Sequence, residues 1–386
     1  MYALVIGRAY PDEKTGMMGI FEFEQAAAIS NIGIKTVYSF CDTRSIKLLR
    51  KLNYTSFQKG NVSVYGYHLP IGGIPRPIFE KLKNSHFKKV LKRIINDHGT
   101  PDIIHIHYPL LNLTDGIWEM LKKLNRPIIV TEHWSKVQTK SIEYYRCDLL
   151  KKIVNESDTF MCVGNLLKKS VIELTNTKKE IHVMPNMVNP TFYLEEKLQE
   201  NNHFDFISIG RLVADKRMSF VIDAFSRAFS ENSNIKLHIV GDGPLFDKLK
   251  QQINKLNMNG RVTLHGFLSR EETANLIRSS DAFVSASILE TFGVPFIESM
   301  ACGKPVIGIK NGPIDNYIND TNGVLFEKDN LNSLTESLKR MYNYRNKYNG
   351  LHISKKAKEF FSERAIVGKL VDIYDSQLQK HGETSR

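Results

Sequence analysis

The chain has 386 residues, which at roughly 150 residues per domain suggests two domains, and its 42% hydrophobic and 24% charged residues exclude a disordered or collagen-like chain. No stretch reaches the ~18 consecutive apolar residues of a transmembrane helix, and the start lacks the features of a signal peptide, so we expect neither. The formal net charge is +12, which can attract nucleic acid, an anionic membrane or an acidic substrate, or can simply keep the protein in solution.

Short apolar runs alternate with amphipathic stretches along the whole chain, a pattern typical of βα units over parallel sheets. A helical pattern at 21–32 ends at Gly33, as expected for a helix C-cap. The proline-rich residues 70–77 are expected to form a loop. In the first half, the sequence predicts strands at 3–6, 36–38, 62–67, 103–106, 128–130, 159–163 and 182–184.

A second series of the same kind predicts strands at 204–209, 236–240, 262–264, 282–285 and 305–308, with helices at 219–230, 245–256, 271–278 and 294–302. The polar segment 195–203 has no apolar face, so we expect it to link two domains. The predicted fold class is α/β, with two doubly wound Rossmann-like domains facing across a cleft. The expected domains are 1–190, completed by a C-terminal helix at 363–382, and 204–350. Ligands of such sheets bind beyond the carboxyl ends of the strands.

Two cations follow the predicted strand 204–209. Gly210 allows a sharp exit from the strand, and Arg211 and Lys216 then lie in the loop that leads to a helix. Two cations at this edge could clamp a diphosphate, Arg by its planar fork and Lys as a point charge. A solvated basic loop would carry the same residues.

A glycine-rich turn follows the strand 236–240. Gly241 and Gly243 would let a ligand approach the backbone closely. The turn lacks the third glycine of the dinucleotide-binding fingerprint, because Phe246 occupies that position. An ordinary tight turn is the alternative.

Two carboxylates stand eight residues apart at Glu290 and Glu298. We expect Glu290 in a loop and Glu298 inside the helix that begins near Pro295. Carboxylates accept hydrogen bonds from paired sugar hydroxyls, although Glu290 could instead favour the helix dipole and Glu298 could be an exposed helix residue. Between the two acids, a helix N-terminus able to bind anions is expected from the amides of Phe292, Gly293 and Val294.

Three features of the first half lie at predicted strand ends. The loop bracketed by Gly16 and Gly19 could approach a phosphate or an acceptor, or could be a flexible turn. His105 and His107 alternate on one face of a strand and would suit a metal only with a third ligand, which the sequence does not supply nearby. His133 ends a strand at its carboxyl edge, where a structural histidine is the alternative.

Taken together, these motifs resemble the retaining glycosyltransferases of the GT-B fold, in particular family 4, the glycosyl transferases group 1. The resemblance is dense over 204–345 and rests on the E-x7-E pair and three further motifs in the family's order, at 210–216, 241–244 and 300–306. It implies that Arg211 and Lys216 hold the donor diphosphate and that Glu298 binds the ribose. It also implies that Glu290 contacts the transferred sugar and that His133 lies beside the reacting centre.

The resemblance also implies the partners. The N-terminal domain would bind the acceptor, a glycan or lipid-linked sugar of cell-envelope or exopolysaccharide synthesis. The C-terminal domain would bind the nucleotide-sugar donor, and a UDP-sugar is the favoured donor. No metal or other cofactor is expected, and the sequence has no Asp-x-Asp motif. The chain departs from the family pattern at 186–189 and 311–315, which leaves the donor sugar and the acceptor open.

The segment 79–95 has apolar residues near helical spacing and a basic opposite face. Such a helix suits an anionic membrane surface, or it packs on the sheet as an ordinary surface helix. The four cysteines are scattered without a C-x-x-C pair, so a disulfide framework and a cysteine zinc site are unsupported and a reducing cytoplasm is expected. If the helix at 79–95 binds an anionic membrane, the protein would be attached peripherally to the inner face of the membrane.

Three rival functions stay open at this point. The chain could be a non-catalytic glycosyltransferase-like subunit that binds glycan or acts as a chaperone, or it could be a sugar-nucleotide epimerase. An NAD oxidoreductase is disfavoured, because no complete G-x-G-x-x-G follows any predicted strand. Nucleic-acid binding rests on net charge alone, and no motif supports it, so we expect no nucleic-acid partner.

Overall fold

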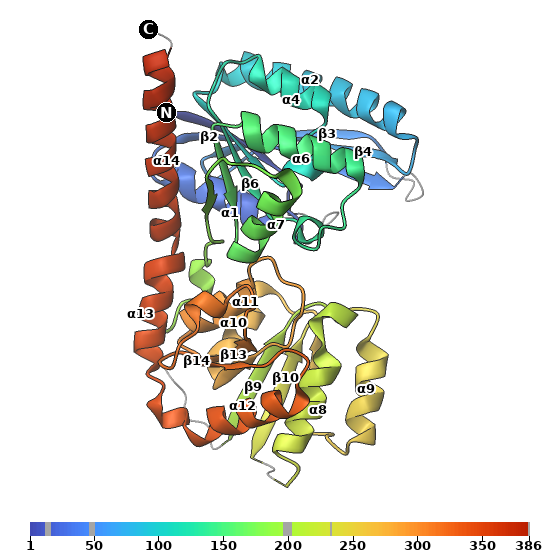
Figure 1. Ribbon diagram of the computed structural model, residues 1–386, viewed down its shortest axis with the longest axis vertical. Helices are drawn as coiled ribbons and strands as arrows, with labels where there is room; N and C mark the ends of the chain where they lie inside the picture. Colours follow the sequence, from blue (N-terminus) through green and yellow to red (C-terminus); the bar gives the residue numbers. More distant parts are fainter. Residues whose placement is uncertain (12–16, 46–50, 196–202, 232–233, 385–386) are drawn as a thin grey trace. The chain divides into compact units, whose positions relative to one another are not determined.

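The computed structural model describes residues 1–11, 17–45, 51–195, 203–231 and 234–384 (Figure 1). The chain divides into two compact units, a first unit of Met1–Met187 with Ile366–Arg386 and a second unit of Val188–Ala365. The predicted fold class, α/β with two doubly wound domains, is confirmed, because each unit is built on a mainly parallel sheet with helices between its strands. Most of the predicted linker, residues 196–202, lies outside the described residues.

The described residues of the first unit form an eight-stranded sheet in the order β3-β4-β2-β1-β5-β6-β7-β8. Only β3 is antiparallel to its neighbour within this described sheet. Every residue of the central strand β1 is buried, which explains why its sequence is one continuous apolar run. The strands are β1 (Tyr2–Gly7), β2 (Lys35–Ser45), β3 (Asn53–Lys59), β4 (Val62–Gly72), β5 (Ile103–His107), β6 (Ile128–Glu132), β7 (Thr159–Cys162) and β8 (Ile181–Val183).

Helices cover the first sheet and include the last helix of the chain, α14 (Glu363–Thr384). Leu370 and Tyr374 of α14 are buried in one cluster with Ala3, Ile103 and Met161 of the sheet, so the C-terminal segment contributes to the core of the first unit. The other helices are α1 (Ile20–Asn31), α2 (Arg76–His98), α3 (Pro109–Asn112), α4 (Asp115–Lys122), α5 (Ser135–Gln138), α6 (Tyr144–Glu156) and α7 (Asn165–Thr175).

The prediction of a loop at 70–77 is wrong at both ends of this segment. Strand β4 continues to Gly72, and its register with β2 shifts between Thr43 and Ser45. A proline is tolerated at such an irregularity, because the ladder is already interrupted there. Helix α2 then starts at Arg76 with Pro77 in its first turn, where the missing amide costs no hydrogen bond.

Helix α2 packs on the sheet through its apolar side and contacts β4. Of the two alternatives for the segment 79–95, the structure therefore shows the surface helix that packs on the sheet. Its buried apolar residues are Phe87, Val90, Leu91 and Ile94, and its exposed basic residues include Lys88, Lys89, Lys92 and Arg93. No helix in the described part of the chain is both long and apolar enough to cross a membrane.

The described residues of the second unit form a six-stranded parallel sheet in the order β11-β10-β9-β12-β13-β14, so β9 lies at the point where the strand order reverses. The strands are β9 (Phe204–Ile209), β10 (Ile235–Val240), β11 (Val262–Gly266), β12 (Ala282–Val284), β13 (Val306–Ile309) and β14 (Gly323–Phe326). The helices are α8 (Met218–Ala228), α9 (Phe246–Lys255), α10 (Arg270–Ser279), α11 (Val294–Ala301), α12 (Leu331–Asn343) and α13 (Gly350–Phe361).

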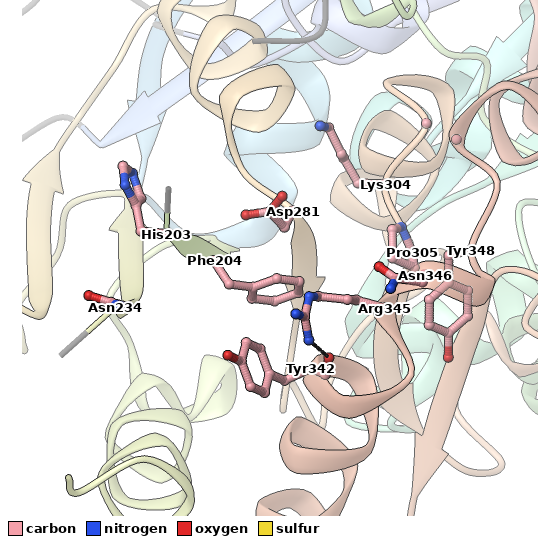
Figure 2. Close-up of a pocket in the computed structure, with 12 residues that line it drawn as sticks. His203, Phe204, Asn234, Asp281, Lys304, Pro305, Tyr342, Arg345, Asn346 and Tyr348 are labelled. Carbon is pink, nitrogen blue, oxygen red and sulfur yellow. Dashed lines mark hydrogen bonds between the residues drawn. The ribbon is translucent and has the colours of Figure 1, made fainter. Parts of the chain in front are cut away.

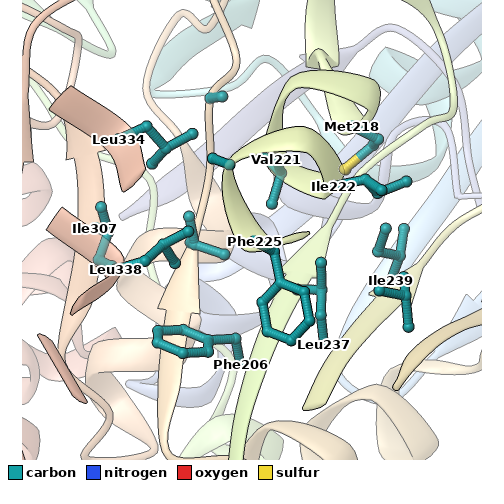
Figure 3. Packing of buried hydrophobic residues seen from close by; sticks show 14 of the residues in the cluster. Phe206, Met218, Val221, Ile222, Phe225, Leu237, Ile239, Ile307, Leu334 and Leu338 are labelled. Atoms are coloured by element: carbon teal, nitrogen blue, oxygen red, sulfur yellow. The ribbon is translucent and has the colours of Figure 1, made fainter. Parts of the chain in front are cut away.

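Buried hydrophobic side chains from the sheet and from the helices beside it pack together in the core of the second unit (Figure 3). Phe206 and Leu237 on the sheet belong to the same buried cluster as Phe225 of α8 and Leu338 of α12. The rings of Phe206 and Phe225 meet edge to face at 6.3 Å.

Candidate active site

The loops that follow β9, β10 and β11 are joined by backbone hydrogen bonds at the carboxyl edge of the second sheet. The amide of Gly241 donates to the carbonyl oxygen of Gly266 (2.8 Å), and the amide of Leu212 donates to that of Asp242 (2.9 Å). Gly241 has φ +136°, and a Cβ placed on it would collide with the carbonyl oxygen of Gly210. Glycine is therefore required by the close approach of two loops. The predicted contact of Gly241 with the donor stays a prediction.

The two cations predicted from the sequence lie in the loop after β9. Arg211 is exposed and makes no ion pair with any described residue. Lys216 forms an ion pair with Glu290, and their side chains are 22% and 17% exposed. The amide of Ile288 also donates to the carbonyl oxygen of Asp215 (3.0 Å). The structure thus brings together a predicted diphosphate ligand and a predicted sugar ligand.

The N-terminus of α11 lies between the two predicted carboxylates. Gly293 is its N-cap with φ +95°, in the left-handed region that favours glycine. The phenyl ring of Phe292 is buried and lies 5.8 Å from that of Phe361, which anchors this turn. Within the described chain, no protein group accepts a hydrogen bond from the amides of Phe292, Gly293 and Val294. These amides can therefore donate hydrogen bonds to an anion or a hydroxyl oxygen, and their predicted role in donor binding stays a prediction.

Glu298 is 7% exposed in α11, so it is buried rather than on an open helix surface. Its Oε1 lies 3.5 Å from Nη2 of Arg270, the first residue of α10. The guanidinium of Arg270 also lies 5.3 Å from the centroid of the Phe192 ring. Sequence reasoning missed Arg270, and its only signal was a basic residue opening the helix after β11. It adds a third cation at the carboxyl edge of this sheet, where Arg211 and Lys216 also lie.

His133 lies in the first unit, in a buried group of aromatic rings. Its Nε2 is 2.9 Å from Nδ1 of His107, and its ring stacks on that of Tyr108 with the centroids 4.6 Å apart. Nδ1 of His105 lies 2.7 Å from the hydroxyl of Tyr374. The described residues include no group of three or more His, Cys, Asp or Glu that could hold a metal ion.

Burial keeps these histidines neutral. It lowers the pKa of His107 to about 3, and it lowers the pKa of His133 well below the ordinary value, with His107 and Arg8 as further causes. At neutral pH, His133 is therefore an uncharged imidazole, in which one ring nitrogen donates a hydrogen bond and the other accepts one.

Glu132 is a functional candidate that the sequence reasoning missed. Its Oε1 accepts hydrogen bonds from the amides of His133 and Trp134, both at 2.8 Å, and it is fully buried. Burial raises its pKa to about 7, although the two amides oppose this shift. A glutamate two residues after the apolar run 128–130 was the available signal. Glu132 positions His133 by holding its backbone.

Of the two glycines predicted to form a binding loop before the first helix, the structure describes one. Gly19 is the N-cap of α1 with φ +88°, and a Cβ there would collide with the carbonyl oxygen of Ala9. The positive φ and the close approach both require glycine. Gly16 lies outside the described residues. Their predicted contacts with a phosphate or an acceptor stay predictions.

A pocket of about 480 Å³ lies elsewhere in the second unit (Figure 2). Phe204 begins β9 and Lys304 precedes β13, so this pocket lies at the amino-terminal edge of the sheet. Arg211 follows the carboxyl end of β9. The pocket is therefore at the edge opposite the predicted donor residues, although Asp281, Arg345, Tyr342 and Tyr348 give it a polar lining.

Two family models match consecutive parts of the chain. Residues 52–192 match Glycosyltransferase Family 4, and residues 192–360 match Glycosyl transferases group 1. An uncharacterized glycosyltransferase of Methanocaldococcus jannaschii is 30% identical over 285 residues, which cover 72% of this chain and 77% of that protein.

Two further proteins are similar to this chain, a lipid glycosyltransferase by its name and a protein solved with UDP. The alpha-monoglucosyldiacylglycerol synthase of Streptococcus pneumoniae is 27% identical over 243 residues, which cover 57% of this chain and 54% of that protein. The crystal structure of Anabaena HepE in complex with UDP has a TM-score of 0.72 at 16% identity and covers 97% of this chain and 100% of that one. At 16% identity, this similarity shows a shared fold.

We expect the pH dependence of stability to change when Glu132 is replaced by glutamine. Folding raises the pKa of Glu132 from 4.5 to about 7. The carboxyl group therefore binds its proton more tightly in the folded chain than in the unfolded chain. The stability from this carboxyl is complete below about pH 4.5 and is lost as the pH rises through 7. Glu132→Gln removes that loss, so its Tm relative to the unaltered chain should be higher at pH 7.5 than at pH 5.

Thermal unfolding of both proteins across this range measures the difference in Tm. The exposed Glu271→Gln is the matched control, because it makes the same substitution outside the buried site. A Tm difference for Glu132→Gln that is the same at pH 5 and pH 7.5 would contradict the assignment.

Proposed function

The chain belongs to the glycosyl transferases group 1 family, and on this premise we propose that it is a retaining, metal-independent enzyme that transfers a sugar from a UDP-sugar to a glycan or lipid-linked acceptor. Membership makes it a glycosyltransferase. The donor, the stereochemistry and the acceptor are the proposal. The observation that carries it is the grouping of Arg211, the ion pair Lys216–Glu290 and the N-terminus of α11 at one edge of the second sheet.

The proposed donor site works by stabilising the leaving diphosphate. As the glycosidic bond to phosphate breaks, negative charge grows on the phosphate oxygens. Arg211 and Lys216 would hold that charge, because they are cations in a preorganised loop and need no metal ion beside them. Glu290 would then turn from Lys216 towards hydroxyls of the transferred sugar, which a carboxylate binds well.

The nucleoside part of the donor is assigned to Glu298. A carboxylate in a buried position can accept hydrogen bonds from both ribose hydroxyls, and Arg270 holds this carboxylate at 3.5 Å. The choice of UDP is supported by HepE, the similar protein that was solved with UDP. In the first unit, neutral His133 would serve the sugar or the acceptor as an uncharged hydrogen-bonding group.

A lipid-linked acceptor is supported by the pneumococcal relative, whose name states that it makes monoglucosyldiacylglycerol. We propose that the chain works in the cytoplasm, attached peripherally to the inner face of the membrane, in the synthesis of a cell-envelope glycan or exopolysaccharide. Because the apolar side of α2 is buried, its exposed basic side would make the contact with anionic lipid.

Replacing Arg211 with methionine should reduce turnover by about 10² to 10³, because the developing phosphate charge loses one preorganised donor. The assay measures sugar transfer and the release of UDP from a panel of UDP-sugars. Arg227→Met is the matched control, since Arg227 is exposed at the end of α8, and it should behave as the unaltered chain. Equal rates for the two variants would contradict the donor site, and a product that is still linked to the nucleotide would indicate an epimerase.

Neutralising Lys88, Lys89, Lys92 and Arg93 together should weaken sedimentation with anionic liposomes, because each basic residue near the surface contributes about 1 kcal/mol of attraction. The unaltered chain should bind weakly to vesicles of neutral lipid, which serve as the control. If the two proteins sediment equally with anionic vesicles, the proposed membrane contact of α2 is wrong.

A further inference from the structure

A cavity of about 310 Å³ lies within the first unit, and the sequence analysis assigned no ligand to it. Its wall includes Arg8, which follows β1, and Thr43, near the end of β2. Leu111 of α3, which follows β5, also lines it, together with residues of α2 and α6. The cavity is therefore at the carboxyl edge of the first sheet, where doubly wound sheets bind ligands.

Lys83 of α2 lines this cavity and is 2% exposed. Its Nζ donates a hydrogen bond to the carbonyl oxygen of Leu111 (2.6 Å). A lysine ammonium has three N–H donors, and this lysine forms no ion pair with any described residue. Burial lowers the pKa of Lys83, and the nearby Cys41 and Glu80 oppose this shift only in part, so an anionic partner would stabilise the charged form of the lysine.

The carboxylates of the cavity wall are already paired with other side chains. Arg146, a further cation of the wall, pairs with Glu143 at 2.9 Å and donates to the carbonyl oxygen of Leu110. It lies close enough to Lys83 to lower the lysine's pKa, after the larger effect of burial. The three acidic residues of the wall pair as Asp42 with His68 (3.0 Å), Glu80 with Arg76 (2.7 Å) and Asp115 with Lys152 (3.3 Å).

We propose that this cavity binds the phosphate group of a phosphate-bearing acceptor, with Lys83 as its anchor. The inference rests on the proposed function, because it names the acceptor class of the first unit. A lysine ammonium is a point charge that suits phosphate, and the guanidinium of Arg146 in the same wall is also of a kind that binds phosphate. The apolar side chains of Phe79, Leu113 and Leu149 line the same cavity and can hold the uncharged part of the acceptor.

The test compares Lys83→Met with Lys81→Met in the full chain, saturated with UDP so that the donor site is filled. Lys81 is exposed on the same helix, so its variant loses the same charge outside the cavity. Inorganic phosphate is titrated while Tm is followed. We expect the Kd for phosphate to rise about tenfold or more in Lys83→Met and to stay unchanged in Lys81→Met.

Vesicles of phosphatidic acid in phosphatidylcholine form the second arm of the test. Binding of free phosphate that Lys83→Met weakens supports a soluble acceptor phosphate, and binding of the vesicles alone, weakened in the same way, supports a lipid headgroup. Equal Kd values in the two variants, or no binding in either arm, would overturn the inference.

Two further measurements keep the result interpretable. If Lys83→Met does not fold, crystals of the unaltered chain soaked in phosphate must show the anion within hydrogen-bond distance of Nζ of Lys83, and an unfilled cavity would overturn the inference. UDP stabilisation of the unaltered chain tests the proposed function separately. Failure of UDP to bind would count against the donor site, while the comparison of the two lysine variants with phosphate would still report on the cavity.

Discussion

The ion pair between Lys216 and Glu290 organises the carboxyl edge of the second sheet. It joins residues 74 positions apart in sequence, because β9 and β12, whose loops carry them, are neighbours in the sheet. Both side chains are largely shielded from solvent, so their attraction is screened less than on an open surface. A diphosphate would offer Lys216 a competing anion. The pair that fixes the two loops is therefore also the pair that donor binding would rearrange.

The donor-side edge of the second sheet and the histidine group of the first unit differ in charge. The second unit gathers Arg211, Lys216 and Arg270 at the edge of its sheet, where they can meet the charge of a leaving diphosphate. The first unit instead buries neutral rings around His133, and burial also raises the pKa of Glu132 to about 7. A charged group there would have to be desolvated, whereas a neutral imidazole offers hydrogen bonds without that penalty. This division suits a reaction in which one substrate carries the charge that develops.

The sequence predicted much of the fold, because buried parallel strands are continuous apolar runs with amphipathic helices between them. It missed strand β3 (Asn53–Lys59), which is exposed at an antiparallel edge and has no apolar pattern. It located Glu290 and Glu298 from their spacing, but it missed Arg270 and Lys83. Their neighbours come from other elements, so only the folded chain brings Arg270 to Glu298 and Lys83 to its cavity.

The measurement that tests this account most directly is a crystal structure of the chain with UDP. The account predicts that diphosphate oxygens lie within hydrogen-bond distance of Arg211 and Lys216, that the ribose hydroxyls lie against Glu298, and that the contact between Lys216 and Glu290 is loosened. UDP bound instead in the pocket of Asp281 and Arg345 at the opposite edge of the sheet would contradict it.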